Sequence, residues 1–259
     1  MDNVIHLQLW QMIAAYIFVI ILLFIVRRKG IPREKEIILS TVRMTIQLIL
    51  TGYILVYLFE NSHPFFTVFI IVIMEAFAVF TIFKRVKVQL STEIKKIIAF
   101  SMIVGTISSL LYFLLVVVRL SPWYDPRYFI PIAGMLIGNS MTGISLGVTR
   151  LVDGMKTQKH LIEAALMLGA TPKTAAKQIV DNAFDSAILP TVNSMVGMGI
   201  VFLPGMMTGQ ILSGTSPVTA IEYQIAIMLG ILGSVALSVI LFVLLGYKTF
   251  FNQDHQLNV

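Results

Sequence analysis

The side chains best placed to do chemistry in this chain are the charged and amide groups that interrupt long hydrophobic segments. Arg43 and Gln47 lie four residues apart in one such segment, on the same face of a helix. Glu75 lies near the middle of the next segment. Because a charge in lipid is costly, Arg43 and Glu75 either form an ion pair that fixes helix packing or face a path for cations. Glu75 is also the candidate metal ligand, since carboxylate and amide oxygens bind hard divalent cations.

A second set of polar and sulfur-containing residues lies in the later hydrophobic segments. Asn139, Asn193 and Ser194 either serve helix packing or line the same path. Met206 and Met207 belong to a group of methionines in this region. Thioethers bind soft Cu(I), but methionines are also adaptable packing residues. The chain has no cysteine, and its histidines lie at segment ends or in loops, so a copper pump is disfavoured.

The composition indicates a protein embedded in a lipid bilayer. Of 259 residues, 57% are hydrophobic and 12% are charged, and the mean hydropathy is +0.89. A soluble domain carries about 25% charged residues, so this chain cannot cover its surface with charge. The absence of cysteine excludes disulfides and thiolate metal sites.

The hydrophobic segments predict a single all-α transmembrane permease domain over residues 1–259, a multi-pass helix bundle. At about 20 residues a span, the chain has room for about seven transmembrane helices. We place them at residues 7–26, 37–59, 65–83, 97–118, 130–148, 188–212 and 220–245. The sixth is the least regular, because Pro190 and Pro204 would break it or make it partly re-entrant.

The basic residues predict an orientation for this bundle. If the N-terminus lies outside and the C-terminus inside, 16 of the 19 lysines and arginines fall in inside loops or tails, as the positive-inside rule requires. The basic balance then needs no nucleic-acid partner. We expect this protein in a plasma membrane, the inner membrane in bacteria.

The longest polar stretch, residues 157–190, separates the fifth and sixth predicted spans. Residues 160–168 have the spacing of a short helix with one apolar face. Gly169 is suited to end that helix in a left-handed conformation, Thr171 to cap the next helix, and Pro172 to occupy its first position. The second helix is expected to end near residue 187, which makes residues 157–187 a cytoplasmic helical element.

Within this element, Glu163-Ala164-Ala165, Gly169 and Ile179 resemble the EAA motif of ABC importer permeases. The match is partial, because Leu189-Pro190 comes later than the motif places it. In that family the motif forms a coupling helix that docks in a cleft of the ATP-binding subunit. The resemblance implies coupling residues at His160, Leu161, Glu163, Ala164, Ala165, Leu168, Gly169, Thr171 and Pro172.

Motifs along nearly the whole chain resemble the FetB-type iron-export permease family, whose plant relatives include aluminium-tolerance permeases. They are Arg43-x-x-x-Gln47-Leu48 with Gly52-Tyr53; Ile130-Pro131-Ile132-Ala133-Gly134-Met135 with Gly138-Asn139; Leu168-Gly169-Ala170-Thr171-Pro172; Leu203-Pro204-Gly205-Met206-Met207 with Gly209; and Tyr223-Gln224.

This resemblance implies a non-enzymatic membrane subunit of an ABC exporter, with iron or a related metal cation as cargo. The chain has no G-x-x-x-x-G-K-[ST] phosphate loop, so ATP and Mg²⁺ would be bound by a separate cytoplasmic ATPase subunit. The small size of the chain favours a homodimer. Two alternatives remain open from the residues alone: an ATP-independent cation transporter or channel that uses Arg43, Gln47 and Glu75, and a membrane scaffold or regulator without transport.

Overall fold

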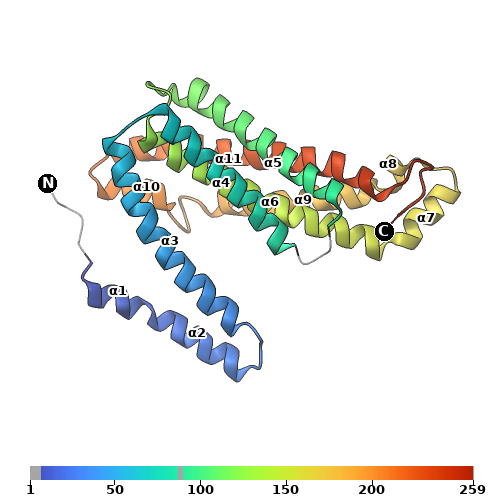
Figure 1. Cartoon of the computed structure of the whole chain (residues 1–259), viewed down its shortest axis with the longest axis horizontal. Coiled ribbons are helices and arrows are strands. Elements are labelled where there is room, and N and C mark those ends of the chain that lie inside the picture. The colour runs from blue at the N-terminus through green and yellow to red at the C-terminus, as the bar shows by residue number, and fades with distance from the viewer. Residues whose placement is uncertain (1–6, 87–89, 259) are drawn as a thin grey trace.

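The computed structural model describes residues 7–86 and 90–258, and this part of the chain is almost entirely helical (Figure 1). The elements are α1 (Leu9–Ala15), α2 (Ile17–Arg28), α3 (Glu34–Glu60), α4 (Pro64–Arg85), α5 (Thr92–Tyr112), the π-helical turn η1 (Phe113–Val118), α6 (Pro126–Thr157), α7 (Lys159–Met167), α8 (Pro172–Ala175), α9 (Lys177–Gly197), α10 (Gly205–Leu212), α11 (Pro217–Gly246) and the 3₁₀ turn η2 (Tyr247–Phe250).

Among the described residues, six helical segments are long and apolar enough to cross a bilayer. They are Leu9–Arg28, Glu34–Glu60, Pro64–Arg85, Thr92–Val118, Pro126–Thr157 and Pro217–Phe250. They coincide with the first five predicted spans and the last one. The chain is therefore an all-helical, multi-pass membrane protein, as its composition predicted.

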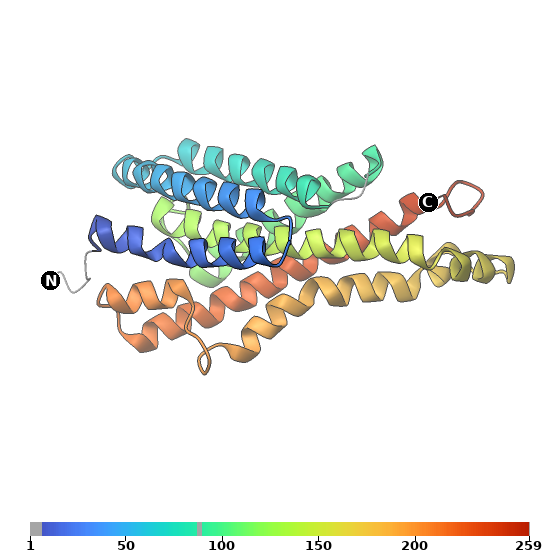
Figure 2. The same ribbon diagram turned by 90° about the horizontal axis from the view of Figure 1, so that it is seen from below.

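The sixth predicted span, residues 188–212, is not a continuous membrane helix. Instead α9 begins in the polar stretch, continues through Pro190 and ends at Gly197, so the expected helix end near residue 187 is wrong. The chain breaks where Gly199 takes a φ of +83°, and α10 starts after Pro204. In both views α9, the break and α10 run in sequence from the end that holds α8 to the opposite end of the bundle (Figures 1 and 2).

The helix α6 is longer than a bilayer requires. Its 32 residues span about 48 Å, whereas a hydrocarbon core is about 30 Å thick. The C-terminal part of α6, with α9 beside it, extends well past the turn between α2 and α3 (Figure 2). This projection carries α7 and α8 at its tip, and η2 lies at the same end of the molecule (Figure 1).

The core lies where α5, α6, α9 and α11 pack together. A Cβ added at Gly105 of α5 would lie 2.6 Å from the Cα atom of Ser238 on α11, so this crossing needs glycine. The hydroxyl oxygens of Ser140 on α6 and Ser234 on α11 are 2.9 Å apart in a buried hydrogen bond. In contrast, α1–α3 stand at the edge, and only 6% of the residues in the α3 span are buried.

Candidate functional site

The corner at the tip of the projection forms as its residue types predict. Gly169 has a φ of +87°, and its N–H donates to the carbonyl oxygen of Leu166 at 2.9 Å. The N–H of Ala170 donates to the carbonyl of Ala165 at 3.0 Å, which completes a Schellman motif at the end of α7. The hydroxyl of Thr171 accepts from the N–H of Thr174 at 3.3 Å, with Pro172 at the first helical position of α8. These contacts confirm the helix, turn and helix.

The apolar face of α7 points outward. Ile162 is the buried residue that fixes this helix to the rest of the chain. Leu161 is 68% exposed and Leu168 is 89% exposed, and they belong to the face predicted as apolar. Met167 beside them is 86% exposed. The tip of the projection thus presents apolar side chains to its surroundings.

The other predicted coupling residues lie around this face. Glu163 is half-exposed and forms an ion pair with Lys159, with Nζ and Oε1 3.7 Å apart. His160 and Ala164 are exposed, and Ala165 is half-buried. A cavity of about 660 Å³ lies beside the corner. Residues 169–173 line one side of it, and residues after α11 line the other: Tyr247, Lys248, Phe251, Asn252 and His255.

The projection is held together by a close contact between its two long helices. A Cβ at Gly154 of α6 would lie 2.5 Å from Cγ2 of Ile179 on α9. Ala183 and Ala187 continue this buried stripe of α9. Because α6 leads into α7 and α9 follows α8, this contact packs together the two helices that connect the corner to the rest of the chain.

Arg43, Gln47 and Glu75 do not form one site. The guanidinium carbon of Arg43 lies 5.0 Å from the ring centroid of Phe77 on α4. Residues 75 and 77 point to nearly opposite sides of α4, so Glu75 faces α5, where the Thr106 hydroxyl donates to its Oε1. The ion pair between Arg43 and Glu75, considered from the sequence, is therefore not formed, and Gln47 is exposed on α3.

Glu75 lines a cavity of about 460 Å³ between α4 and α5 whose other described lining residues are apolar. Its Oε2 has no hydrogen-bond partner among the described residues. No group of three or more His, Cys, Asp or Glu residues that could hold a metal ion occurs in residues 7–86 and 90–258. A metal-binding role for Glu75 stays a prediction.

The break between α9 and α10 brings three predicted path residues together. Asn139, Ser194 and Met206 line one cavity of about 230 Å³, together with Thr191 and Gln224. The amide of Asn139 donates to the carbonyl of Met135 at 2.7 Å, which leaves its amide oxygen available. Asn193 is exposed on α9 and does not line this cavity.

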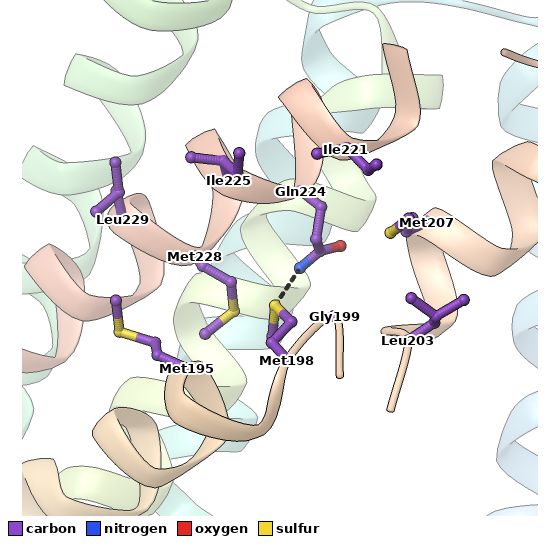
Figure 3. A pocket seen from close by; sticks show the side chains of 10 residues that line it. All are labelled: Met195, Met198, Gly199, Leu203, Met207, Ile221, Gln224, Ile225, Met228 and Leu229. Carbon is purple, nitrogen blue, oxygen red and sulfur yellow. Dashed lines mark hydrogen bonds between the residues drawn. The ribbon is translucent and has the colours of Figure 1, made fainter. Parts of the chain in front are cut away.

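A second cavity of about 400 Å³ adjoins the first on the side of α10 and α11, and Met207 lies on its wall (Figure 3). Met198, Gln224 and Met228 line both cavities and so form the partition between them. Gln224 is buried, and its amide nitrogen lies 3.8 Å from the sulfur of Met198. We call this three-residue group the partition.

The sequence does not predict the partition as part of the path. Met198 belongs to the same stretch of methionines as Met206 and Met207, and Gln224 appears only in the Tyr223-Gln224 motif. Met228 carries no sequence signal within an apolar helix. An amide in an otherwise hydrophobic span was the available clue at Gln224, because a polar group in a membrane helix usually faces protein or water.

Comparison with known proteins identifies relatives over almost the full length of the chain. Residues 9–251 match the family described as Uncharacterised protein family (UPF0014). The UPF0014 membrane protein YjkA of Bacillus subtilis is 35% identical, over 93% of this chain and 94% of its own. The protein ALUMINUM SENSITIVE 3 of Arabidopsis thaliana is 34% identical, over 94% and 88%. No solved structure matches the chain.

The resemblance drawn from the motifs is confirmed by a further relative. The probable iron export permease protein FetB of Escherichia coli is 34% identical, over 95% of this chain and 93% of its own. The family match and these relatives together show that the chain belongs to the UPF0014 family of membrane proteins.

Proposed function

We propose that this chain is the permease subunit of an ATP-driven ABC exporter that moves iron or a related metal cation across the plasma membrane. The observation that carries the proposal is the exposed apolar face of α7 at the tip of the projection, with Leu161, Met167 and Leu168 uncovered. Exposed apolar patches of this kind mark interaction sites. The partner that fits is a cytoplasmic ATPase subunit that binds ATP and Mg²⁺, which this chain has no motif to bind.

The cargo follows from the relatives and stays part of the proposal. One relative is named a probable iron export permease and another carries aluminium sensitivity in its name. Both names concern metals.

The orientation that fits has the N-terminus outside and the C-terminus inside, because the end of the bundle with α7 and α8 is also the end toward which the basic turn of Arg27, Arg28 and Lys29 points (Figure 1). Lys87, counted with these basic residues, lies outside the described part of the chain.

We further propose that two copies of the chain form the membrane part. Arg43 and Gln47 are exposed on α3, Arg43 about a third of the way along the helix and Gln47 near its middle, in a span in which few residues are buried. A charged group facing lipid at that depth is costly, so a protein surface must cover it. A second copy is the partner that a chain of this size needs in order to enclose a path.

The test is co-purification: the tagged chain is purified from the membranes of its own host, and an ABC ATPase subunit should be retained with it. Leu161→Asp and Leu168→Asp should abolish association, and Glu163→Lys or Gly169→Pro should weaken it, while all four variants still insert in the membrane. Gln178→Asp, at an exposed position of α9, is the control and should behave as wild type.

Undiminished association of the α7 variants would contradict the coupling role. Metal flux into liposomes that contain the purified chain alone, driven by a gradient without ATPase, would favour the ATP-independent transporter instead. Association without ATP-dependent flux in a reconstituted pair would favour a scaffold or regulator.

The dimer is tested by cross-linking, for which the lack of cysteine is an advantage. Gln47→Cys introduces a single thiol on the proposed interface and should give a disulfide-linked dimer in oxidised membranes. Leu115→Cys, at an exposed position of η1, is the matched control and should stay monomeric. Equal yields of dimer from both variants would contradict the assignment of the interface to α3.

A further inference from the structure

The two adjoining cavities at the helix break are rich in methionine. Met195 and Met207 line the larger cavity, Met135 and Met206 line the smaller one, and Met198 and Met228 belong to both. These side chains come from α6, α9, the break, α10 and α11. In Figure 3 the side chains of Met195, Met198 and Met228 lie close together on one side of the larger cavity and Met207 on the other, with Gln224 above Met198.

Gln224 indicates that this region is more than packing. Its side chain is 6% exposed, and its amide oxygen is buried without a hydrogen-bond partner among the described residues. Its amide nitrogen contacts only a thioether, a weak acceptor. A buried amide oxygen without a partner is unfavourable unless a water molecule or a ligand satisfies it. The oxygen therefore offers a donor atom for a ligand beside the sulfurs.

The lining limits what that ligand can be. Among the residues that line the two cavities there is no carboxylate, imidazole or basic group. The available donors are thioether sulfurs, amide oxygens and the hydroxyls of Thr191 and Ser194. Hard divalent cations prefer carboxylates, whereas thioethers select soft cations such as Cu(I).

We infer that the partition of Met198, Gln224 and Met228, with Met195 beside it, is a binding site for a soft monovalent cation of the Cu(I) and Ag(I) class. Two thioether sulfurs supply the principal ligands and the Gln224 oxygen adds a weaker one. The site rests on the proposed permease function for its use in transport, and it adds a class of cargo chemically distinct from iron. Because its ligands are thioethers and an amide, it needs neither cysteine nor histidine, and it revises the expectation from the sequence that copper is disfavoured. Its occupancy does not depend on the ATPase.

The experiment uses Ag⁺ as the probe and the full chain in lipid nanodiscs, in nitrate buffer so that silver chloride does not precipitate. Isothermal titration should show saturable Ag⁺ binding to the wild type. The double variant Met198→Leu/Met228→Leu keeps side-chain volume, so the bundle should persist. Its affinity should fall by at least roughly 100-fold, because loss of an outer-shell partner alone typically costs about 10- to 100-fold and this variant removes both principal ligands.

The matched control is Met12→Leu/Met44→Leu, which changes two exposed methionines on α1 and α3. It should bind Ag⁺ as the wild type does. Equal losses in both double variants would show that silver binds exposed methionines in general and would overturn the site. Unchanged affinity in Met198→Leu/Met228→Leu would overturn it too.

A measurement on the unaltered protein guards against a variant that does not fold. With ¹³C-labelled methionine methyl groups, Ag⁺ should shift the Met198 and Met228 resonances and leave those of Met12 and Met44 in place. The reverse pattern would contradict the site. These readouts need no ATPase. A failed co-purification would therefore refute the proposed function and leave the cation site standing. Absent silver binding would refute the cation site and leave the proposed function standing.

Discussion

The first and last hydrophobic spans of this protein are alike in composition but differ in what surrounds them. The span α1–α2 has 6% of its residues buried, whereas half of the span that contains α11 is buried against α5, α6 and α9. Hydrophobicity alone places a helix in lipid, because lipid is as apolar as leucine. Packing among helices needs small residues and polar contacts, and these are concentrated at α5, α6 and α11. The difference teaches that α11 is held by packing against the rest of the chain, whereas α1–α3 have little such packing.

The largest expected effect compares two glycines. Gly105→Ala places a Cβ 2.6 Å from the backbone of Ser238, so α5 and α11 must move apart, at a cost of about 1–3 kcal/mol. Gly52→Ala in α3 meets nothing within 4 Å and should stabilise the helix by up to about 1 kcal/mol. Thermal unfolding in nanodiscs measures both. If the unfolding temperature fell equally in the two variants, the distinction between the core and the edge helices would be wrong.

A smaller effect is expected at the buried hydrogen bond between α6 and α11. Ser140→Ala leaves the hydroxyl of Ser234 without that partner and should cost about 1 kcal/mol. In the edge region, Thr45→Val removes the contact between the hydroxyl oxygens of Tyr16 and Thr45, 2.6 Å apart at an exposed position, and should cost less. The same unfolding assay compares the two variants, and a larger loss for Thr45→Val would reverse the ranking of the regions.

The smallest effect on the fold is expected at Arg43. Arg43→Leu removes its contact with Phe77, worth about 0.5–1 kcal/mol, and also removes a charge from an exposed membrane face. Stability of the single chain should therefore change little, while cross-linking through Gln47→Cys should fall in the combined variant. Undiminished cross-linking would show that Arg43 is not part of the contact between copies.

The spans and the corner could be predicted from the sequence because both depend on local chemistry. Hydrophobic length located six segments with ends within about five residues of the helices, except that α6 continues to Thr157, past the predicted end at residue 148. Gly169, Thr171 and Pro172 are each residue types with a specific role at a helix boundary. The continuous path of α9 through Pro190 was missed because the polar half of this helix looks like a separate element. Its buried stripe of Ile179, Ala183 and Ala187 shows that one helix serves both halves.

The candidate sites were predicted less well, because they depend on contacts between distant segments. Arg43 and Glu75 do not pair because of the rotation of side chains around α4. Phe77, which contacts Arg43, points to the side of the helix nearly opposite Glu75, which contacts Thr106. The polarity of Asn139 and Ser194 and the methionine neighbourhood of Met206 predict path residues, and these three side chains do share a cavity. The partition could not be predicted because it depends on the rotation of α11 about its own axis relative to the break. That rotation brings Gln224 and Met228 to Met198, and no local sequence pattern encodes it.

The length of α6 gives the molecule a mechanical property. Asn139 lies about 20 Å from the first residue of the helix and Thr157 ends it about 27 Å further on, by the rise of an α-helix. A helix that tilts as a rigid rod about a point midway between these two levels carries both levels by equal distances in opposite directions. Because Gly154 leaves no space between α6 and α9, α9 would follow such a tilt. The tip and the cavities beside Asn139 would then move together without any change within the helices themselves.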